Sequence, residues 1–192
     1  MIVLGIDTSL DACSVAVVRD GETLSHLREE MNRGQAERLA PMVRDAAQQA
    51  GIAFADLDRI AVTTGPGSFT GVRVGLSFAR ALALSLSKPC IGVSTLEALA
   101  LEDGEDGARA ALVETPGASY FARYEDSVAV IAPRNIERGA HEALVGNAQL
   151  KGPAVTVNAA ALAMRAAKLD PAHYPPNPTY LRAPHVTLPP GS

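Results

Sequence analysis

The start of the chain alternates apolar runs with short polar breaks. Residues 2–6 and 12–18 are almost continuously apolar, whereas residues 22–28 alternate apolar and polar positions. Patterns of this length are typical of buried and half-buried strands. Asp20-Gly21, between the second and third runs, is a strong hairpin signal. We therefore expect a three-stranded antiparallel meander.

One amphipathic stripe follows, over residues 35–50. Its apolar members recur three, four and seven residues apart, which is the spacing of one helix face. They are Leu39, Met42, Val43, Ala46, Ala47 and Ala50. Gly51 suits the position just after a helix end. Pro41 lies inside the pattern and predicts either a kink or a later helix start.

A strand pattern at 59–64, a glycine loop and a second helix pattern at 70–87 come next, before a strand at 90–93. The second helix is apolar or small nearly all round, and a helix of that kind is buried on all sides. Two situations would achieve this. The helix lies between the two halves of the protein, or its outer face is an interaction site. We favour the interaction site.

The second half repeats this order after the charged break at 102–107. The expected strands are 108–114, 119–124, 127–132 and 154–157, and the expected helices are 136–145 and 158–169. Two βββαβα units predict an α/β protein with a duplicated ribonuclease-H-like architecture. We place the units at residues 1–100 and 101–192, the second one shortened and ending in a proline-rich, irregular tail.

The composition and charge of the chain restrict the classes of protein to which it can belong. Hydrophobic residues make up 47% of the chain, so it is globular, and a net charge of −4 disfavours direct binding to nucleic acid. Cys13 and Cys90 lie in apolar runs and are expected to be buried thiols. The first residues lack the basic start of a signal peptide, and no apolar run approaches the ~20 residues that span a bilayer. We expect a cytoplasmic protein without a membrane segment.

The glycine loop contains Gly65, Gly67 and Gly71. It lacks the Lys of a P-loop, and its spacing departs from that of a dinucleotide-binding loop. The simpler interpretation is a tight turn whose glycines allow close strand–helix packing, with at least one glycine at positive φ. A phosphate-binding loop is the alternative.

Asp7 ends the first strand and is followed by Thr8 and Ser9. This arrangement matches the phosphate-binding hairpin of actin-like folds, or else a locally capped turn. The rival functional hypothesis is therefore a small actin-like ATPase or kinase that uses Asp7 and the glycine loop. It needs a second phosphate loop and a second acidic residue, and neither is evident. The histidines lack metal-ligand spacing, so we predict no metal, no cofactor and no catalytic residue.

Four segments together resemble a known family. They are "VLGIDTSLDACSVAVV" (3–18), "GPGSFTGVRVGLSFARAL" (65–82), "GVSTLEALA" (92–100) and "PTYLRAP" (178–184). The chain resembles the TsaB family of bacterial tRNA threonylcarbamoyladenosine biosynthesis proteins, which are non-catalytic paralogues within the TsaD, or M22 glycoprotease, family. The resemblance implies an actin/hexokinase-like (ASKHA) fold and a scaffold role. It also implies a heterodimer with TsaD, a ternary complex with TsaE, and contact with tRNA only through the complex.

The same resemblance places the TsaD contact on the two N-terminal helices. As interface candidates we take the apolar stripes of both helices. They are Leu39, Met42, Val43, Ala46, Val72, Leu76, Ala79 and Ala83. Without TsaD, such a surface is expected to pair with a second copy in a symmetric homodimer.

Overall fold

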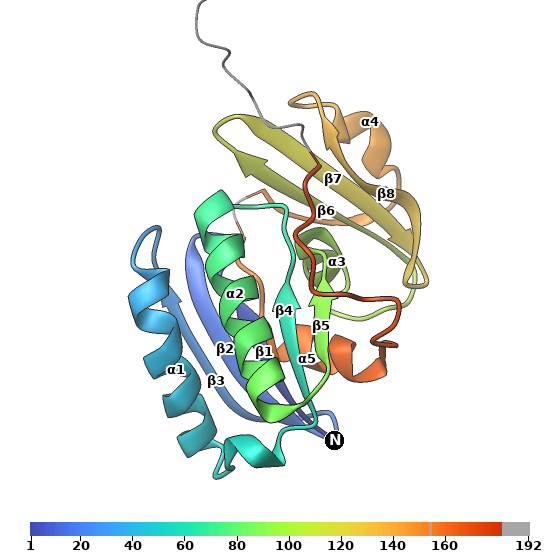
Figure 1. Cartoon of the computed structure of the whole chain (residues 1–192). Coiled ribbons are helices and arrows are strands. Elements are labelled where there is room, and N and C mark those ends of the chain that lie inside the picture. Colours follow the sequence, from blue (N-terminus) through green and yellow to red (C-terminus); the bar gives the residue numbers. More distant parts are fainter. Residues whose placement is uncertain (154, 182–192) are drawn as a thin grey trace, which may run out of the picture.

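The computed structural model describes residues 1–153 and 155–181, which form two β-sheets with helices between and around them (Figure 1). The first sheet has the order β3-β2-β1-β4-β5, and the second has the order β8-β7-β6-β9. The first sheet contains β1 (Ile2–Asp7), β2 (Ala12–Arg19), β3 (Glu22–Glu30), β4 (Arg59–Thr63) and β5 (Cys90–Val93). The second contains β6 (Ala108–Thr115), β7 (Ala118–Glu125), β8 (Val128–Ile136) and β9 (Gln149–Lys151). The helices are α1 (Gln35–Gln49), α2 (Phe69–Leu86), α3 (Thr95–Ala100), α4 (His141–Val145) and α5 (Ala159–Lys168).

Both halves have the predicted βββαβα order. In each sheet three consecutive strands are antiparallel, and a later strand joins the first of them in parallel: β4 beside β1, and β9 beside β6. The expected strand at 154–157 is wrong, because the strand is β9 at Gln149–Lys151. Three residues are too few for a periodic signal, and Val157, from the expected strand, is fully buried in the core without belonging to a strand.

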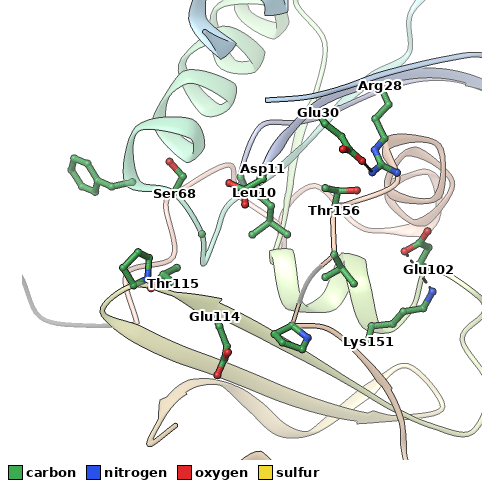
Figure 2. Close-up of a pocket in the computed structure, with 16 residues that line it drawn as sticks. Leu10, Asp11, Arg28, Glu30, Ser68, Glu102, Glu114, Thr115, Lys151 and Thr156 are labelled. Carbon is green, nitrogen blue, oxygen red and sulfur yellow. Dashed lines mark hydrogen bonds and ion pairs between the residues drawn. The ribbon is translucent and has the colours of Figure 1, made fainter. Parts of the chain in front are cut away.

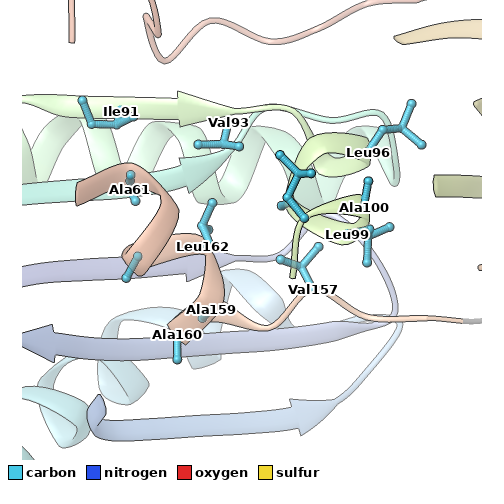
Figure 3. Packing of buried hydrophobic residues seen from close by; sticks show 14 of the residues in the cluster. Ala61, Ile91, Val93, Leu96, Leu99, Ala100, Val157, Ala159, Ala160 and Leu162 are labelled. Atoms are coloured by element: carbon cyan, nitrogen blue, oxygen red, sulfur yellow. The ribbon is translucent and has the colours of Figure 1, made fainter. Parts of the chain in front are cut away.

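Each sheet is packed against a helix that follows the other sheet in the chain. Helices α1 and α2 cover one face of the first sheet, and α5 covers the opposite face (Figure 1). Gly5 on β1 allows that approach, since a Cβ there would lie 2.2 Å from the carbonyl oxygen of Ala159. Helix α3 follows the first sheet in the chain yet packs on the second. One apolar core therefore spans both sheets, with Leu96 and Leu99 of α3 and Leu162 of α5 at its centre (Figure 3). The unit boundary at residue 100 stays a prediction.

A mostly buried polar contact joins α3 and α5. Arg165 on α5 donates from Nε and Nη2 to Glu97 Oε1 on α3, at 3.1 and 3.0 Å. Tyr174 donates to the same oxygen at 3.3 Å. The Arg165 and Glu97 side chains are only 12% and 11% exposed. Because a mostly buried charge needs its partner, this pair links the second half to the first.

Helix α1 runs without interruption from Gln35 to Gln49 and includes Pro41, so a later start is wrong. A proline costs the helix one backbone hydrogen bond. The stripe of Leu39, Met42 and Val43 is buried against the sheet, and that burial outweighs the loss.

Helix α2 is not buried between the two halves, so that alternative is wrong, and the favoured interaction site stays a prediction. Only one third of its residues are buried, and its outer face is exposed, Leu84 at 83%. The expectation that no segment is long and apolar enough to span a bilayer is also wrong. The 18 residues of α2 have a mean hydropathy of 1.2 and could cross a membrane by length and composition alone. In the fold its inner face packs on the first sheet.

After α5 the chain forms an irregular strap at residues 171–181. The strap runs along the edge strand β5, where Gly92 N–H donates to the Tyr174 carbonyl oxygen at 2.9 Å. Thr179 N–H donates to the Thr64 carbonyl oxygen at 2.8 Å. The expected irregular tail is thus seen as far as Leu181, and the rest of it lies outside the described residues.

Candidate functional site

The glycine loop is filled by the protein's own β1–β2 turn. Ser68 N–H donates to the Ser9 carbonyl oxygen at 2.7 Å, and Thr8 Oγ1 donates to the Gly71 carbonyl oxygen at 2.7 Å. A Cβ on Gly67 would lie 2.1 Å from the Ser9 oxygen, and one on Gly71 would lie 2.1 Å from the Thr8 oxygen. Both glycines are therefore required by the approach of two backbone segments.

Gly65 has a different task. Its φ of +94° lies in the left-handed region, which glycine tolerates and other residues rarely adopt. Its carbonyl oxygen accepts the Thr95 N–H at 2.9 Å and so connects the loop to the start of α3. The expectation of a glycine at positive φ is confirmed.

Asp7 lies beneath this contact and is fully buried. Its Oδ1 accepts from Ser9 N–H at 3.1 Å, from Ser9 Oγ at 2.6 Å and from Thr63 Oγ1 at 2.6 Å. Its Oδ2 has no hydrogen-bond partner among the described residues. Burial raises the pKa of Asp7 above its ordinary value of 3.8, and the hydrogen bonds oppose that shift only in part.

Asp7, Thr8 and Ser9 were candidate phosphate contacts, and this geometry requires a correction. All three are at most 1% exposed. The space beside them is filled by Gly67 and Gly71, so no phosphate group fits between the turn and the loop. The actin-like ATPase or kinase hypothesis required that space to be open.

A cleft of about 880 Å³ does open beside the turn, between Leu10 and Asp11 on one side and Glu114 and Lys151 on the other (Figure 2). Its wall is acidic, with Asp11, Glu30, Glu102 and Glu114. Both cations of the described lining are paired: Arg28 with Glu30 at 2.9 Å, and Lys151 with Asp103 at 2.6 Å. Burial also raises the pKa of Glu102. Negative charge and paired cations make the cleft a poor fit for a polyphosphate. No group of three or more potential metal ligands occurs within residues 1–153 and 155–181.

The eight interface candidates do not form a surface. Each is at most 7% exposed, and all belong to the core between the two helices and the first sheet. The residues are Leu39, Met42, Val43, Ala46, Val72, Leu76, Ala79 and Ala83. The correction has a simple cause, since an apolar stripe packs first on the protein's own sheet. Any docking face on these helices must be the opposite one, which on α2 exposes Arg73, Ser77, Arg80, Ala81 and Leu84.

The sequence reasoning missed one surface feature. Phe69 begins α2 at the edge of the cleft, and its ring centroid lies 6.4 Å from that of Tyr180 in the strap. The Arg73 guanidinium carbon lies 5.1 Å from the Phe69 centroid. The chain has only four Phe and four Tyr, so two exposed aromatic rings side by side are unusual. The sequence does not predict this pair, because Phe69 and Tyr180 are far apart in the chain.

The comparisons with known proteins agree with one another. The family model described as TsaD, tRNA N6-adenosine threonylcarbamoyltransferase, matches residues 27–152. A tRNA threonylcarbamoyladenosine biosynthesis protein TsaB from Escherichia coli is 37% identical over 171 residues, covering 82% of this chain and 71% of that protein. A TsaB from Haemophilus influenzae is 41% identical over 97 residues, covering 50% of this chain and 41% of that protein. Among solved structures, YeaZ from Pseudomonas aeruginosa superposes with a TM-score of 0.75 and 27% identity, covering 94% of this chain and 99% of that one.

Proposed function

Because the chain belongs to the TsaB family of tRNA threonylcarbamoyladenosine biosynthesis proteins and is homologous to TsaD, we propose that it is a non-catalytic scaffold subunit in that modification. In this proposal it pairs with TsaD, and TsaE joins the pair. The complex then transfers a threonylcarbamoyl group to the adenosine beside the anticodon of tRNAs that read ANN codons.

The observation that carries the non-catalytic role is the filled glycine loop. The rival ATPase or kinase hypothesis needs Asp7 and the glycine loop to be open to a phosphate group. Here Thr8 and Ser9 occupy that space through backbone contacts at Gly67 and Gly71. Opening it would break two short hydrogen bonds and separate α2 from the sheet. Asp7 is meanwhile sealed from solvent.

The docking face in this proposal is the outer side of α1 and α2. Helix α2 leaves small and apolar residues exposed there, including Ala81 and Leu84, next to the half-buried Phe78 and Leu82. Exposed apolar surface of this kind favours association. TsaD, as a homologue, is expected to present equivalent helices. Without TsaD a second copy would occupy the face in a homodimer.

Two alanines on α2 give a matched test. Ala81 is exposed and Ala79 is fully buried, so the same substitution probes the outer and the inner face. Ala81→Glu should leave the stability of the monomer nearly unchanged, since surface substitutions usually shift it by less than about 0.5 kcal/mol. It should abolish both the homodimer and the TsaD complex in analytical ultracentrifugation. Ala79→Glu should instead unfold the chain, because it buries an unpaired carboxylate.

Two results would contradict the proposal. The first is an Ala81→Glu chain that binds TsaD as tightly as the unmodified chain, which would place the docking face elsewhere. The second is ATP hydrolysis or tRNA modification by the purified chain alone, provided that Asp7→Asn removes the activity.

A further inference from the structure

Two aromatic rings and one guanidinium form an exposed cluster at the edge of the cleft. Phe69 and Tyr180 are each 62% exposed, and their rings are tilted by 32° at 6.4 Å between centroids. Arg73 lies one helical turn after Phe69 and stacks over its ring. We call Phe69, Arg73 and Tyr180 the aromatic platform. Side chains of these types are the ones that stack on unpaired bases.

The platform is held in place from both sides. Ser68 caps α2 by accepting the Gly71 N–H at 3.2 Å, which fixes the turn that carries Phe69. The strap carries Tyr180 and is attached by the Thr179 N–H to the Thr64 carbonyl oxygen, with a second contact at 2.9 Å between the two hydroxyls. Rings ordered in advance lose little entropy when a flat partner stacks on them.

The local charge identifies the side from which a polyanion would approach. The chain as a whole has a net charge of −4, but α2 contains two arginines, Arg73 and Arg80, and no acidic residue. Both arginines lie on its exposed face. Asp11 and Glu114 line the cleft on the other side of Phe69 and would repel phosphates there. A nucleic-acid backbone is therefore expected to pass Arg73 at the first turns of α2, with a base over the rings, while the later part of the outer face, around Ala81 and Leu84, stays with TsaD.

We propose that the aromatic platform stacks an unpaired base of the tRNA that the assembled complex binds. The inference rests on the proposed function, because two arginines cannot hold an RNA alone and the remaining affinity must come from the partners. The platform would add a contact that orients the loop of the tRNA relative to the complex.

The test measures binding of an anticodon stem-loop RNA to the complex of the full chain with TsaD, with 2-aminopurine placed in the loop. Stacking quenches its fluorescence. Phe69→Leu should weaken RNA binding about 5- to 100-fold, which is the value of one stacked base, and should remove the quenching. Phe69→Trp should retain both. Arg73→Gln should lower the slope of affinity against salt by about one contact. Val128→Ala, at an exposed apolar position on β8, is the matched control and should change nothing.

Affinity for TsaD is measured in parallel for every variant. Unchanged RNA affinity and quenching in Phe69→Leu would overturn the platform while leaving the proposed function intact. So would a loss of TsaD affinity with normal RNA binding at saturating TsaD, which would make the rings a protein contact. If the unmodified chain does not bind TsaD, the proposed function fails. The platform then fails with it, because the inference rests on that complex.

Discussion

Gly71 and Gly75 face the same residue, Thr8, but in different ways. A Cβ on Gly71 would lie 2.1 Å from the Thr8 backbone oxygen, and a Cβ on Gly75 would lie 2.5 Å from its side-chain Oγ1. Real Cβ contacts essentially never fall below 3.0 Å. Alanine at Gly71 therefore forces the turn and the helix apart. Alanine at Gly75 requires only that one hydroxyl move or be removed.

The expected magnitude follows from two opposing effects. Replacing a helical glycine by alanine normally stabilises by about 0.5–1 kcal/mol. Overpacking a closed contact costs about 1–3 kcal/mol, and more where the neighbour is backbone. For Gly71→Ala the contact must open from 2.1 to at least 3.0 Å, which also strains the hydrogen bond from Thr8 Oγ1 to the Gly71 carbonyl oxygen. We expect a net loss of about 1–3 kcal/mol, or a fall in Tm of several degrees.

The assay is urea unfolding of a double-mutant cycle with Thr8→Ala. That change removes Oγ1 and leaves the backbone oxygen in place. It should rescue Gly75→Ala, so that the double variant is no less stable than Thr8→Ala alone, but it should not rescue Gly71→Ala. Ser77→Ala, on the exposed face of α2, controls for helix propensity and should be neutral or slightly stabilising. Stabilisation by Gly71→Ala, or equal rescue of both glycines, would refute the claim that the loop is closed on the turn.

Three further outcomes test the interior. Because burial raises the pKa of Asp7, its contribution to stability is full below its ordinary pKa of 3.8 and is lost as the pH rises through the higher folded value, so the stability of the unmodified chain relative to Asp7→Asn should fall as the pH rises above 3.8; urea midpoints over a pH series check it, and a flat difference contradicts it. Arg165→Met should cost about 2–4 kcal/mol by leaving the mostly buried Glu97 without its cation and with only the Tyr174 hydroxyl as a donor, and adding Glu97→Gln should recover part of this in thermal unfolding; equal losses in both variants would count against the pair. Arg59→Met should cost about 1–2 kcal/mol, since Arg59 Nη1 donates to the carbonyl oxygen of Ala166 at the end of α5, at 3.1 Å, and to that of the C-cap residue Leu169, at 2.6 Å; a urea-unfolding loss below about 0.5 kcal/mol would show that α5 does not need this cap.

Much of the fold could be predicted because its signals are local. In the meander, in α1 and in β4 the spacing of apolar residues is long enough to identify each strand or helix. The fold class follows from the order of these elements. Strand β9 could not be predicted, since Gln149–Lys151 has three residues and its place beside β6 is decided by tertiary contacts. The six residues of α3 are likewise too few for a helical period.

The site was harder to predict, because tertiary contacts decide which side of a helix faces the core and which side stays exposed. An apolar helix does not reveal which side another surface covers. One signal in α2 could have been used: small residues recur every four positions at Gly71, Gly75, Ala79 and Ala83, and that stripe is the closely packed inner face. The filled glycine loop has no such signal, since the sequence shows that a glycine is present but not which backbone approaches it.

Reconstituted tRNA modification tests the central claim most directly. Purified TsaD, TsaE, tRNA and threonylcarbamoyl adenylate are combined with the unmodified chain, with Asp7→Asn, with Ala81→Glu or with no chain. The modified adenosine is measured per TsaD molecule, and assembly of each complex is measured separately. A scaffold predicts full modification with the unmodified chain and with Asp7→Asn, and none with Ala81→Glu or without the chain. Loss of modification in an Asp7→Asn complex that still assembles would contradict the account, because it would place chemistry at the buried turn.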